Sequence, residues 1–312
     1  MVSLPVMKPA AVPAGARIAV IAPASNAKLE RIDGGVAALK RMGFDVVLGA
    51  YAAGKTAPYF AGTVEERLED IHDAFSDPEI QTIISTRGGY GSNYLLEDLD
   101  LDLIAENPKP WFGYSDLTAV QTVLLDELGL VGFHGPMVAA DFCREGGVHE
   151  PSFLSALRGD AVKVGASEGL RILKPGQARG VVHGGCLSML VASLGTPFAP
   201  QTEGKLLFLE DVGVKPYQVD RMLRQMVLAG KFDGVTGFVF GEMLECASPG
   251  ASPDLLDQVI LRVLDWFDGP IAIGLRSGHV SRGNVTLPMG IEAEILLEDE
   301  PVLEYLESAV QV

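Results

Sequence analysis

The first half of the chain alternates short apolar runs with amphipathic segments, and no other feature of the sequence constrains the fold more. Apolar runs at 16–22, 44–48 and 82–86 predict buried strands, whereas the segments 29–42 and 63–75 have the apolar spacing of helices. Strands that alternate with helices in this way form a parallel sheet whose two faces are covered by the helices. We therefore predict an α/β fold for the N-terminal half.

A segment of different composition divides the chain of 312 residues, which is long enough for two domains. Residues 144–180 contain paired glycines, prolines, a short predicted helix near 152–158 and a charged stretch, and we interpret this segment as a linker. We expect an N-terminal α/β domain over 1–143, with a mostly parallel sheet flanked by helices, and a C-terminal α/β domain over 181–312 with a β-rich end. The C-terminal elements that we expect are helices at 187–194, 217–228 and 253–267 and strands at 205–209, 237–240, 271–273, 285–287 and 293–297.

The chain is strongly acidic, with a formal net charge of −17 from 41 acidic and 24 basic residues. Nucleic acid and anionic membrane surfaces are bound by basic patches, and the basic residues of this chain do not cluster. We therefore expect neither nucleic acid nor a membrane as a partner. The sequence has no apolar run long enough for a membrane span and no apolar leader segment, so we expect a cytoplasmic protein.

Cysteine usage and the absence of metal or nucleotide motifs narrow the chemistry further. Cys143, Cys186 and Cys246 are widely spaced and form no Cys-x-x-Cys pair, which argues against a disulfide framework or a zinc site. The sequence also lacks His-Glu-x-x-His and the complete glycine fingerprints of nucleotide-binding loops. We therefore expect no metal and no cofactor.

The segment Gly113-Tyr-Ser-Asp-Leu117 joins a predicted strand to a predicted helix, with Ser115 at the apex of the turn. A serine in this position points its hydroxyl outward at a helix start, where backbone N–H groups are unpaired. This is the geometry that a serine nucleophile needs. The alternative is that Ser115 only caps the helix, since serine is a favoured N-cap residue.

A serine nucleophile needs a base, and the chain has five histidines. His72 lies within a predicted helix and His149 in the expected linker, so we interpret both as structural or solvent-exposed. His134, His183 and His279 each follow or end an apolar strand, where open parallel sheets place their ligands. Spacing alone does not choose among these three.

The base should in turn be oriented by a carboxylate at a strand end. Glu210 and Asp211 directly follow the apolar run at 205–209, and a buried charge there needs a partner. Either residue fits this role. The alternative is that the two residues simply begin a loop.

The glycine-rich loop Arg87-Gly-Gly-Tyr-Gly91 follows the predicted strand at 82–86 and precedes a helix that we expect from about Asn93. Glycine lets the backbone approach a ligand closely, so this loop and the N–H of Asp116 could supply the donors that stabilise an oxyanion. The Arg87 guanidinium suits a substrate carboxylate. We expect Arg87 and Tyr90 to contact the substrate.

These motifs together resemble one family, the LD-carboxypeptidases, which includes muramoyl-tetrapeptide carboxypeptidase and the microcin C resistance peptidases. The resemblance covers nearly the whole chain, and the motifs occur in family order. They are Ile21-Ala-Pro-Ala-Ser25, Phe60-Ala-Gly-Thr63, Thr86-Arg-Gly-Gly-Tyr-Gly91, Gly113-Tyr-Ser-Asp116, His134-Gly-Pro136, Leu194-Gly-Thr-Pro197, Leu209-Glu-Asp-Val-Gly213, Gly278-His279 and Leu287-Pro-Met-Gly290.

The resemblance implies a catalytic triad of Ser115, Glu210 and His279, shared between the two domains. It also implies an oxyanion hole formed around Asp116 and Gly88-Gly89. The implied reaction is metal-free hydrolysis of an amide bond from an L- to a D-amino acid, which releases terminal D-alanine from murein tetrapeptides. In this family the reaction serves cytoplasmic cell-wall recycling, commonly by homodimers, so we expect a murein peptide and a second copy of the chain as partners.

Two other interpretations stay open. The first is the same chemistry on an aminoacyl-nucleotide amide, as in the microcin-resistance branch of the family. Cys186 stands where the family often has Asn, and Val214 where it often has an acidic residue, so both positions bear on substrate preference. The second is a two-domain α/β protein that binds a small ligand without catalysis, in which Ser115 only caps a helix.

Overall fold

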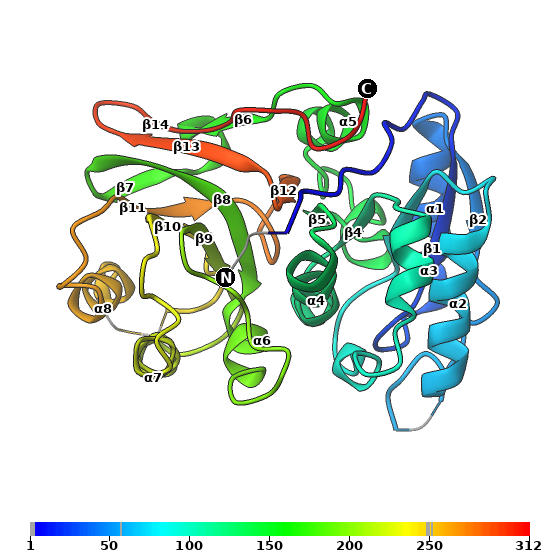
Figure 1. Cartoon of the computed structure of the whole chain (residues 1–312), viewed down its shortest axis with the longest axis horizontal. Coiled ribbons are helices and arrows are strands. Elements are labelled where there is room, and N and C mark those ends of the chain that lie inside the picture. Colours follow the sequence, from blue (N-terminus) through cyan, green and yellow to red (C-terminus); the bar gives the residue numbers. More distant parts are fainter. Residues whose placement is uncertain (1–3, 57, 248–249, 251) are drawn as a thin grey trace.

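The structure, a computed structural model, describes residues 4–56, 58–247, 250 and 252–312 and contains two β-sheets that lie side by side (Figure 1). The first sheet has the strand order β12-β5-β4-β3-β1-β2, in which β1 to β5 are parallel and β12 is antiparallel to β5. Its strands are β1 (Arg17–Ile21), β2 (Asp45–Leu48), β3 (Thr82–Ser85), β4 (Trp111–Gly113), β5 (Gly132–His134) and β12 (Leu287–Met289).

Helices cover the first sheet, as the alternating pattern predicts. They are α1 (Leu29–Arg41), α2 (Val64–Ser76), α3 (Leu101–Glu106), α4 (Thr118–Leu128) and α5 (Glu150–Arg158). Helix α2 begins as expected, because Thr63 and Glu66 form a reciprocal capping box. The helix expected from Asn93 is wrong: a short 3-10 turn at Ser92–Tyr94 is followed by a loop, and α3 begins only at Leu101.

The second sheet has the strand order β6-β14-β13-β8-β9-β10-β11-β7. Its central strands β8 to β11 are parallel, and the outer strands pair antiparallel. The strands are β6 (Lys163–Gly165), β7 (Arg171–Lys174), β8 (Gly176–Cys186), β9 (Lys205–Glu210), β10 (Gly237–Gly241), β11 (Ile271–Leu275), β13 (Glu292–Leu297) and β14 (Pro301–Tyr305). Helices α6 (Leu187–Ala192), α7 (Pro216–Leu228) and α8 (Leu255–Val263) pack beside it (Figure 1).

Two parts of the expected organisation differ from the structure. The segment 144–180 contains α5, as predicted, but it also contains β6 and β7, which are edge strands of the second sheet and were not expected. Strand β12 was expected in the β-rich end of the C-terminal domain, but it pairs with β5 in the first sheet. Both errors arise from partners that are distant in sequence. The division at residues 143 and 181 stays a prediction.

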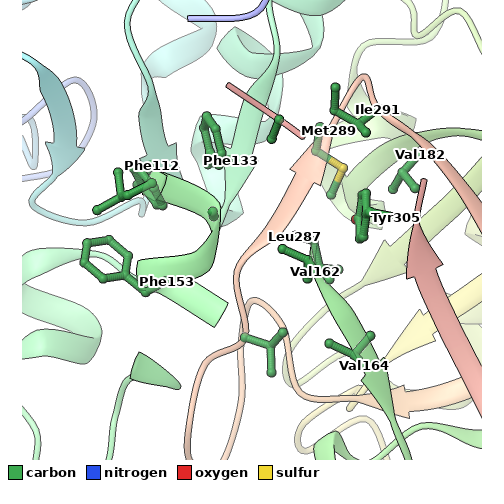
Figure 2. Packing of buried hydrophobic residues seen from close by; sticks show 14 of the residues in the cluster. Phe112, Phe133, Phe153, Val162, Val164, Val182, Leu287, Met289, Ile291 and Tyr305 are labelled. Carbon is green, nitrogen blue, oxygen red and sulfur yellow. The ribbon is translucent and has the colours of Figure 1, made fainter. Parts of the chain in front are cut away.

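One apolar core continues from the first sheet to the second. Figure 2 shows Phe112, Phe133 and Phe153 on one side and Val182 and Tyr305 on the other, with side chains of β12 between them. All of these residues are almost completely buried. The core therefore fixes the carboxyl ends of the first sheet's strands relative to those of the second, which is where the predicted site residues lie.

Candidate active site

Ser115 lies two residues after β4, at the first residue of a 3-10 helix, Ser115–Leu117. Its φ of 65° is in the left-handed region, which costs a residue with a Cβ about 1–2 kcal/mol. Strain of this kind persists where surrounding contacts hold it, and it clusters at functional sites. Within the described chain the N-cap of this turn is Tyr114, so Ser115 is not the capping residue that the alternative interpretation required.

Two hydrogen bonds between Asp116 and Ser92 hold the strained turn. The Asp116 carboxylate accepts a hydrogen bond from the Ser92 N–H at 2.7 Å, and the Asp116 carbonyl accepts one from the Ser92 hydroxyl at 2.6 Å. On the other side of the turn, a Cβ on Gly113 would lie 3.1 Å from Leu117 Cγ, so the Leu117 side chain packs closely against this glycine. The contacts of Ser92, the first residue of the 3-10 turn at Ser92–Tyr94, therefore also help to hold the backbone next to Ser115.

Ser115 opens into a cavity of about 270 Å³. The cavity is also lined by His279, Arg87 and the Gly88-Gly89 pair, so four of the predicted site residues share it with the serine. Tyr90 is not among the described residues that line the cavity. It packs instead against Tyr59, with ring centroids 5.6 Å apart.

Gly88 lies directly against Ser115, and Gly89 lies against Ser25. A Cβ on Gly88 would lie 2.8 Å from Ser115 Cβ and 3.1 Å from both Ser115 Oγ and the Asp116 nitrogen, so no side chain fits there. Gly89 has a φ of 108°, and a Cβ on it would lie 2.5 Å from Ser25 Oγ. The Ser25 hydroxyl accepts a hydrogen bond from the Tyr90 N–H at 3.1 Å and so anchors the loop.

His279 is bonded to Glu210, which ends β9. The His279 main-chain N–H donates to Glu210 Oε2 at 3.0 Å, and His279 Nδ1 lies 2.8 Å from the same oxygen. The Glu210 side chain is 1% exposed and the His279 side chain 20% exposed. Two contacts to one oxygen fix the orientation of the imidazole ring, whose edge remains accessible from the cavity.

Glu210 and His279 each shift the pKa of the other toward its charged form. Burial would raise the pKa of Glu210, but His279 and His134 outweigh it and lower this pKa to about 2. Burial would lower the pKa of His279, but the charge and hydrogen bond of Glu210 outweigh it and raise this pKa above the ordinary 6.5. The pair therefore consists of an anionic carboxylate and a histidine that is more basic than usual.

The other candidate histidines lie in different surroundings. His183 Nε2 lies 2.9 Å from Asp126 Oδ1, and the His183 side chain is 1% exposed. His134 is equally buried and lies behind Glu210, with its Nδ1 3.0 Å from Ser277 Oγ. His72 accepts a hydrogen bond from the Asp100 N–H, and His149 is the N-cap of α5.

The structure also separates Glu210 from its neighbour Asp211. The Asp211 carboxylate accepts hydrogen bonds from the Ser188 N–H and the Val212 N–H, both at 2.9 Å. It therefore holds the first turn of α6 and points away from His279. Glu210 is the residue of the two that contacts a histidine.

Two further residues, to which the sequence motifs assigned no role of their own, lie against the candidate site. Tyr114 packs edge-on against His279, with ring centroids 5.0 Å apart. Gly278 has a φ of 87°, and a Cβ on it would lie 2.6 Å from Glu210 Cδ, so only glycine lets the chain turn beside this carboxylate. Tyr114 directly precedes Ser115 and Gly278 directly precedes His279. This adjacency is the feature of the sequence that could have indicated their position near the site.

No group of three His, Cys, Asp or Glu side chains is placed to hold a metal ion within the described ranges. No helix in the same ranges has the length and apolar character that a membrane span needs.

The sequence and the structure were compared with known proteins. Residues 18–135 match the LD-carboxypeptidase N-terminal domain, and residues 179–295 match the LD-carboxypeptidase C-terminal domain. A probable murein peptide carboxypeptidase of Bacillus subtilis is 35% identical over 291 residues, which cover 92% of this chain and 90% of the relative.

The chain is also similar to proteins that are named for microcin immunity. The microcin C7 self-immunity protein MccF of Escherichia coli is 30% identical over 318 residues, which cover 90% of each chain. A solved structure of MccF in complex with glutamyl sulfamoyl guanosine superposes with a TM-score of 0.90 at 27% identity, covering 97% of this chain and 99% of that one.

Proposed function

The chain belongs to the LD-carboxypeptidase family and is a serine carboxypeptidase, and we propose that Ser115, His279 and Glu210 are its catalytic residues. One observation carries this proposal. A strained serine and a histidine line the same cavity, and the histidine is bonded through Nδ1 to a buried carboxylate. This is the arrangement by which a serine hydroxyl is activated on many unrelated folds.

In the proposed mechanism, His279 Nε2 removes the proton of the Ser115 hydroxyl as Oγ attacks the scissile carbonyl. Glu210 holds the Nδ1–H tautomer and stabilises the imidazolium that forms. His279 then gives the proton to the departing amine, so the C–N bond breaks and an acyl-enzyme remains on Ser115. A water, deprotonated by His279, hydrolyses this ester and restores the serine.

The negative charge of the tetrahedral intermediate needs preorganised donors. We assign the oxyanion hole to the N–H groups around Gly88, Gly89 and Asp116. The close approach of Gly88 to Ser115 Oγ supports this assignment, because it brings backbone of the loop next to the attacking atom. Each such donor is worth about 3 kcal/mol of activation free energy where it has been measured.

We propose that the substrate is a murein tetrapeptide and that the enzyme releases its terminal D-alanine. The similarity to the probable murein peptide carboxypeptidase of Bacillus subtilis supports this substrate. In this reaction Arg87, at the cavity wall, binds the terminal carboxylate. A position in cytoplasmic cell-wall recycling and a homodimeric state follow from the family resemblance and stay predictions.

A second candidate is an aminoacyl-nucleotide amide. The similarity to MccF, whose solved complex contains glutamyl sulfamoyl guanosine, favours it. The reaction steps would be the same, with an aminoacyl group instead of a peptidyl group on Ser115.

The two substrates are distinguished by offering both to the purified protein. We expect stoichiometric D-alanine from a murein tetrapeptide and at least about tenfold lower kcat/KM for an aminoacyl-sulfamoyl nucleotide or aminoacyl-phosphoramidate. The Ser115→Ala variant is the control for a contaminating peptidase. Turnover of the nucleotide with no release of D-alanine would replace the first substrate by the second.

A further inference from the structure

A buried contact joins the two sheets at the candidate site. His134 ends β5 of the first sheet, and Glu210 ends β9 of the second. His134 Nε2 lies 3.8 Å from Glu210 Oε1, and both side chains are 1% exposed. Both contacts of His279 go to the other oxygen, Oε2. The Glu210 carboxylate therefore lies between two histidines, with one close to each oxygen.

The oxygen on the His134 side needs a donor. Within the described residues neither Glu210 Oε1 nor His134 Nε2 has a hydrogen-bond partner. A buried carboxylate oxygen without a donor is costly, and such atoms are rare in native proteins. The separation of 3.8 Å is about 1 Å longer than a charge-assisted hydrogen bond. Hydrogen bonds of catalytic groups are often long before substrate binds, so we expect this contact to shorten in the working enzyme.

Ser277 bears on which nitrogen of His134 carries the proton. The Ser277 hydroxyl is completely buried and lies 3.0 Å from His134 Nδ1. If Nδ1 donated to this hydroxyl, a neutral His134 would turn a lone pair on Nε2 toward the carboxylate oxygen. If the hydroxyl donates to Nδ1, the proton is on Nε2 and is available to Glu210 Oε1. Only the second arrangement gives the buried anion a donor.

Neighbouring groups hold the His134 ring in place. Phe208 on β9 packs edge-on against it, with ring centroids 5.0 Å apart. Gly278 lies against both partners, because a Cβ on it would lie 2.8 Å from His134 Cε1 and 2.6 Å from Glu210 Cδ. The chain at Gly278 therefore leaves the imidazole little room to turn away from the carboxylate.

His134 also connects Glu210 to the strand that leads to Ser115. In the first sheet His134 is the register partner of Gly113 on β4, two residues before Ser115. His134 is not among the described residues that line the cavity, so we assign it no contact with the substrate. A contact from His134 to Glu210 thus relates the carboxylate of the second sheet to the serine of the first.

We infer that His134 is a positioning residue for Glu210: its Nε2–H holds Oε1 and so keeps Oε2 on His279 Nδ1. This inference rests on the proposed function, in which Glu210 orients His279. Without the hydrogen bond from His134 the carboxylate is held less firmly, and His279 spends less time in the orientation that accepts the Ser115 proton. Substrate binding is unchanged, so the effect falls on kcat and not on KM.

Substitution of His134 tests this role in the purified protein, with the better of the two proposed substrates as the assay. We expect His134→Phe, which keeps a planar ring, to lower kcat about tenfold with KM unchanged. His134→Gln places an amide N–H near the Nε2 position and should restore most of the loss. His183→Phe, at another histidine that is 1% exposed, is the matched control and should leave kcat within about threefold. A Gln variant as slow as the Phe variant, or an equal loss in the control, would overturn the inference.

A double-mutant cycle determines whether the effect passes through Glu210. In a Glu210→Gln background His134→Phe should change kcat less than about twofold, because the charge on which His134 acts is gone. A tenfold loss in that background too would show that His134 only fills space, and would overturn the inference. Near-normal kcat of Glu210→Gln alone would instead count against the proposed triad.

The protonation of His134 can be measured without altering the active protein. In protein labelled with nitrogen-15 at histidine, we expect His134 Nε2 to have the chemical shift of a protonated nitrogen at neutral pH. Comparison with the His134→Gln protein identifies the signal. An unprotonated Nε2 would overturn the inference, even if His134→Phe failed to fold.

Discussion

The protein contains two histidine–carboxylate pairs of nearly equal length in very different surroundings. His279 lies 2.8 Å from Glu210, and His183 lies 2.9 Å from Asp126. The His279 side chain is 20% exposed and lines the cavity beside Ser115, whereas the His183 side chain is 1% exposed. Within the described chain the second ring nitrogen of His183 is buried and has no hydrogen-bond partner.

The difference explains why we assign the proposed catalytic role to only one of the two pairs. What matters is the surroundings of the second nitrogen. In His279 the ring edge is accessible from the cavity that holds a strained serine, while in His183 both sides are enclosed by protein. Only the first pair is therefore placed for the proton transfers of the proposed mechanism, and the second links α4 to β8.

The largest contrast is expected from removing each imidazole. His279→Ala should lower kcat/KM by about ten-thousand-fold, because it removes the general base, with little change in Tm. His183→Ala should leave kcat/KM within a few-fold but lower the free energy of unfolding by about 1–3 kcal/mol, since Asp126 loses a buried partner. Steady-state kinetics and thermal unfolding of both variants make the comparison, and equal kinetic losses would contradict it.

Neutralising the carboxylate of each pair should again lower kcat only for the Glu210–His279 pair, and by less than removal of the imidazole does. Glu210→Gln should lower kcat about a thousandfold or more, because it removes the charge that stabilises the imidazolium. Asp126→Asn should leave kcat nearly unchanged. If the Asp126 variant were as slow as the Glu210 variant, catalysis would not depend on the first pair alone.

Substitution of a glycine at the cavity should lower kcat less than either change to the Glu210–His279 pair. Gly88→Ala should lower kcat about a hundredfold, because the new Cβ would lie 2.8 Å from Ser115 Cβ and displace the loop from the nucleophile. Gly132→Ala is the matched control on β5, since a Cβ there meets nothing closer than 3.9 Å. Similar kcat values for the two variants would remove Gly88 from the proposed oxyanion hole.

The smallest expected effect is in the pH profile. His279 must be neutral to act as a base, and Glu210 raises the pKa of His279 above the ordinary 6.5. As the pH falls, kcat/KM should therefore decline with a midpoint above 6.5, and Glu210→Gln should move that midpoint to lower pH. A midpoint at or below 6.5 in the unaltered protein would contradict the assigned pairing.

Much of the fold could be predicted because its signals are local. The Thr63 capping box and the apolar runs of β1, β3 and β9 each specify their own element. The helix expected from Asn93 failed because hydrogen bonds between Ser92 and Asp116, far apart in sequence, hold the segment as a turn. Strand β12 was misplaced for the same reason, since its partner β5 lies about half the chain away.

The candidate site divides in the same way. The turn at Ser115 and the loop at Gly88 could be read from local motifs, whereas the choice among histidines depends on which carboxylate each one meets in the folded chain. Glu210 and His279 are separated by 69 positions, and the pairing of His183 with Asp126 is equally invisible in the sequence. In the sequence, only the family resemblance favours His279 over His134 and His183.

The central claim is that Ser115 is the nucleophile, and the most direct measurement is D-alanine release from a murein tetrapeptide by the Ser115→Ala protein. Removal of one Oγ atom leaves the fold intact, so Tm should stay within a few degrees of the unaltered value. We predict that release falls by about ten-thousand-fold or more, while the unaltered protein turns over the same peptide. Near-normal release by the purified variant would contradict the account.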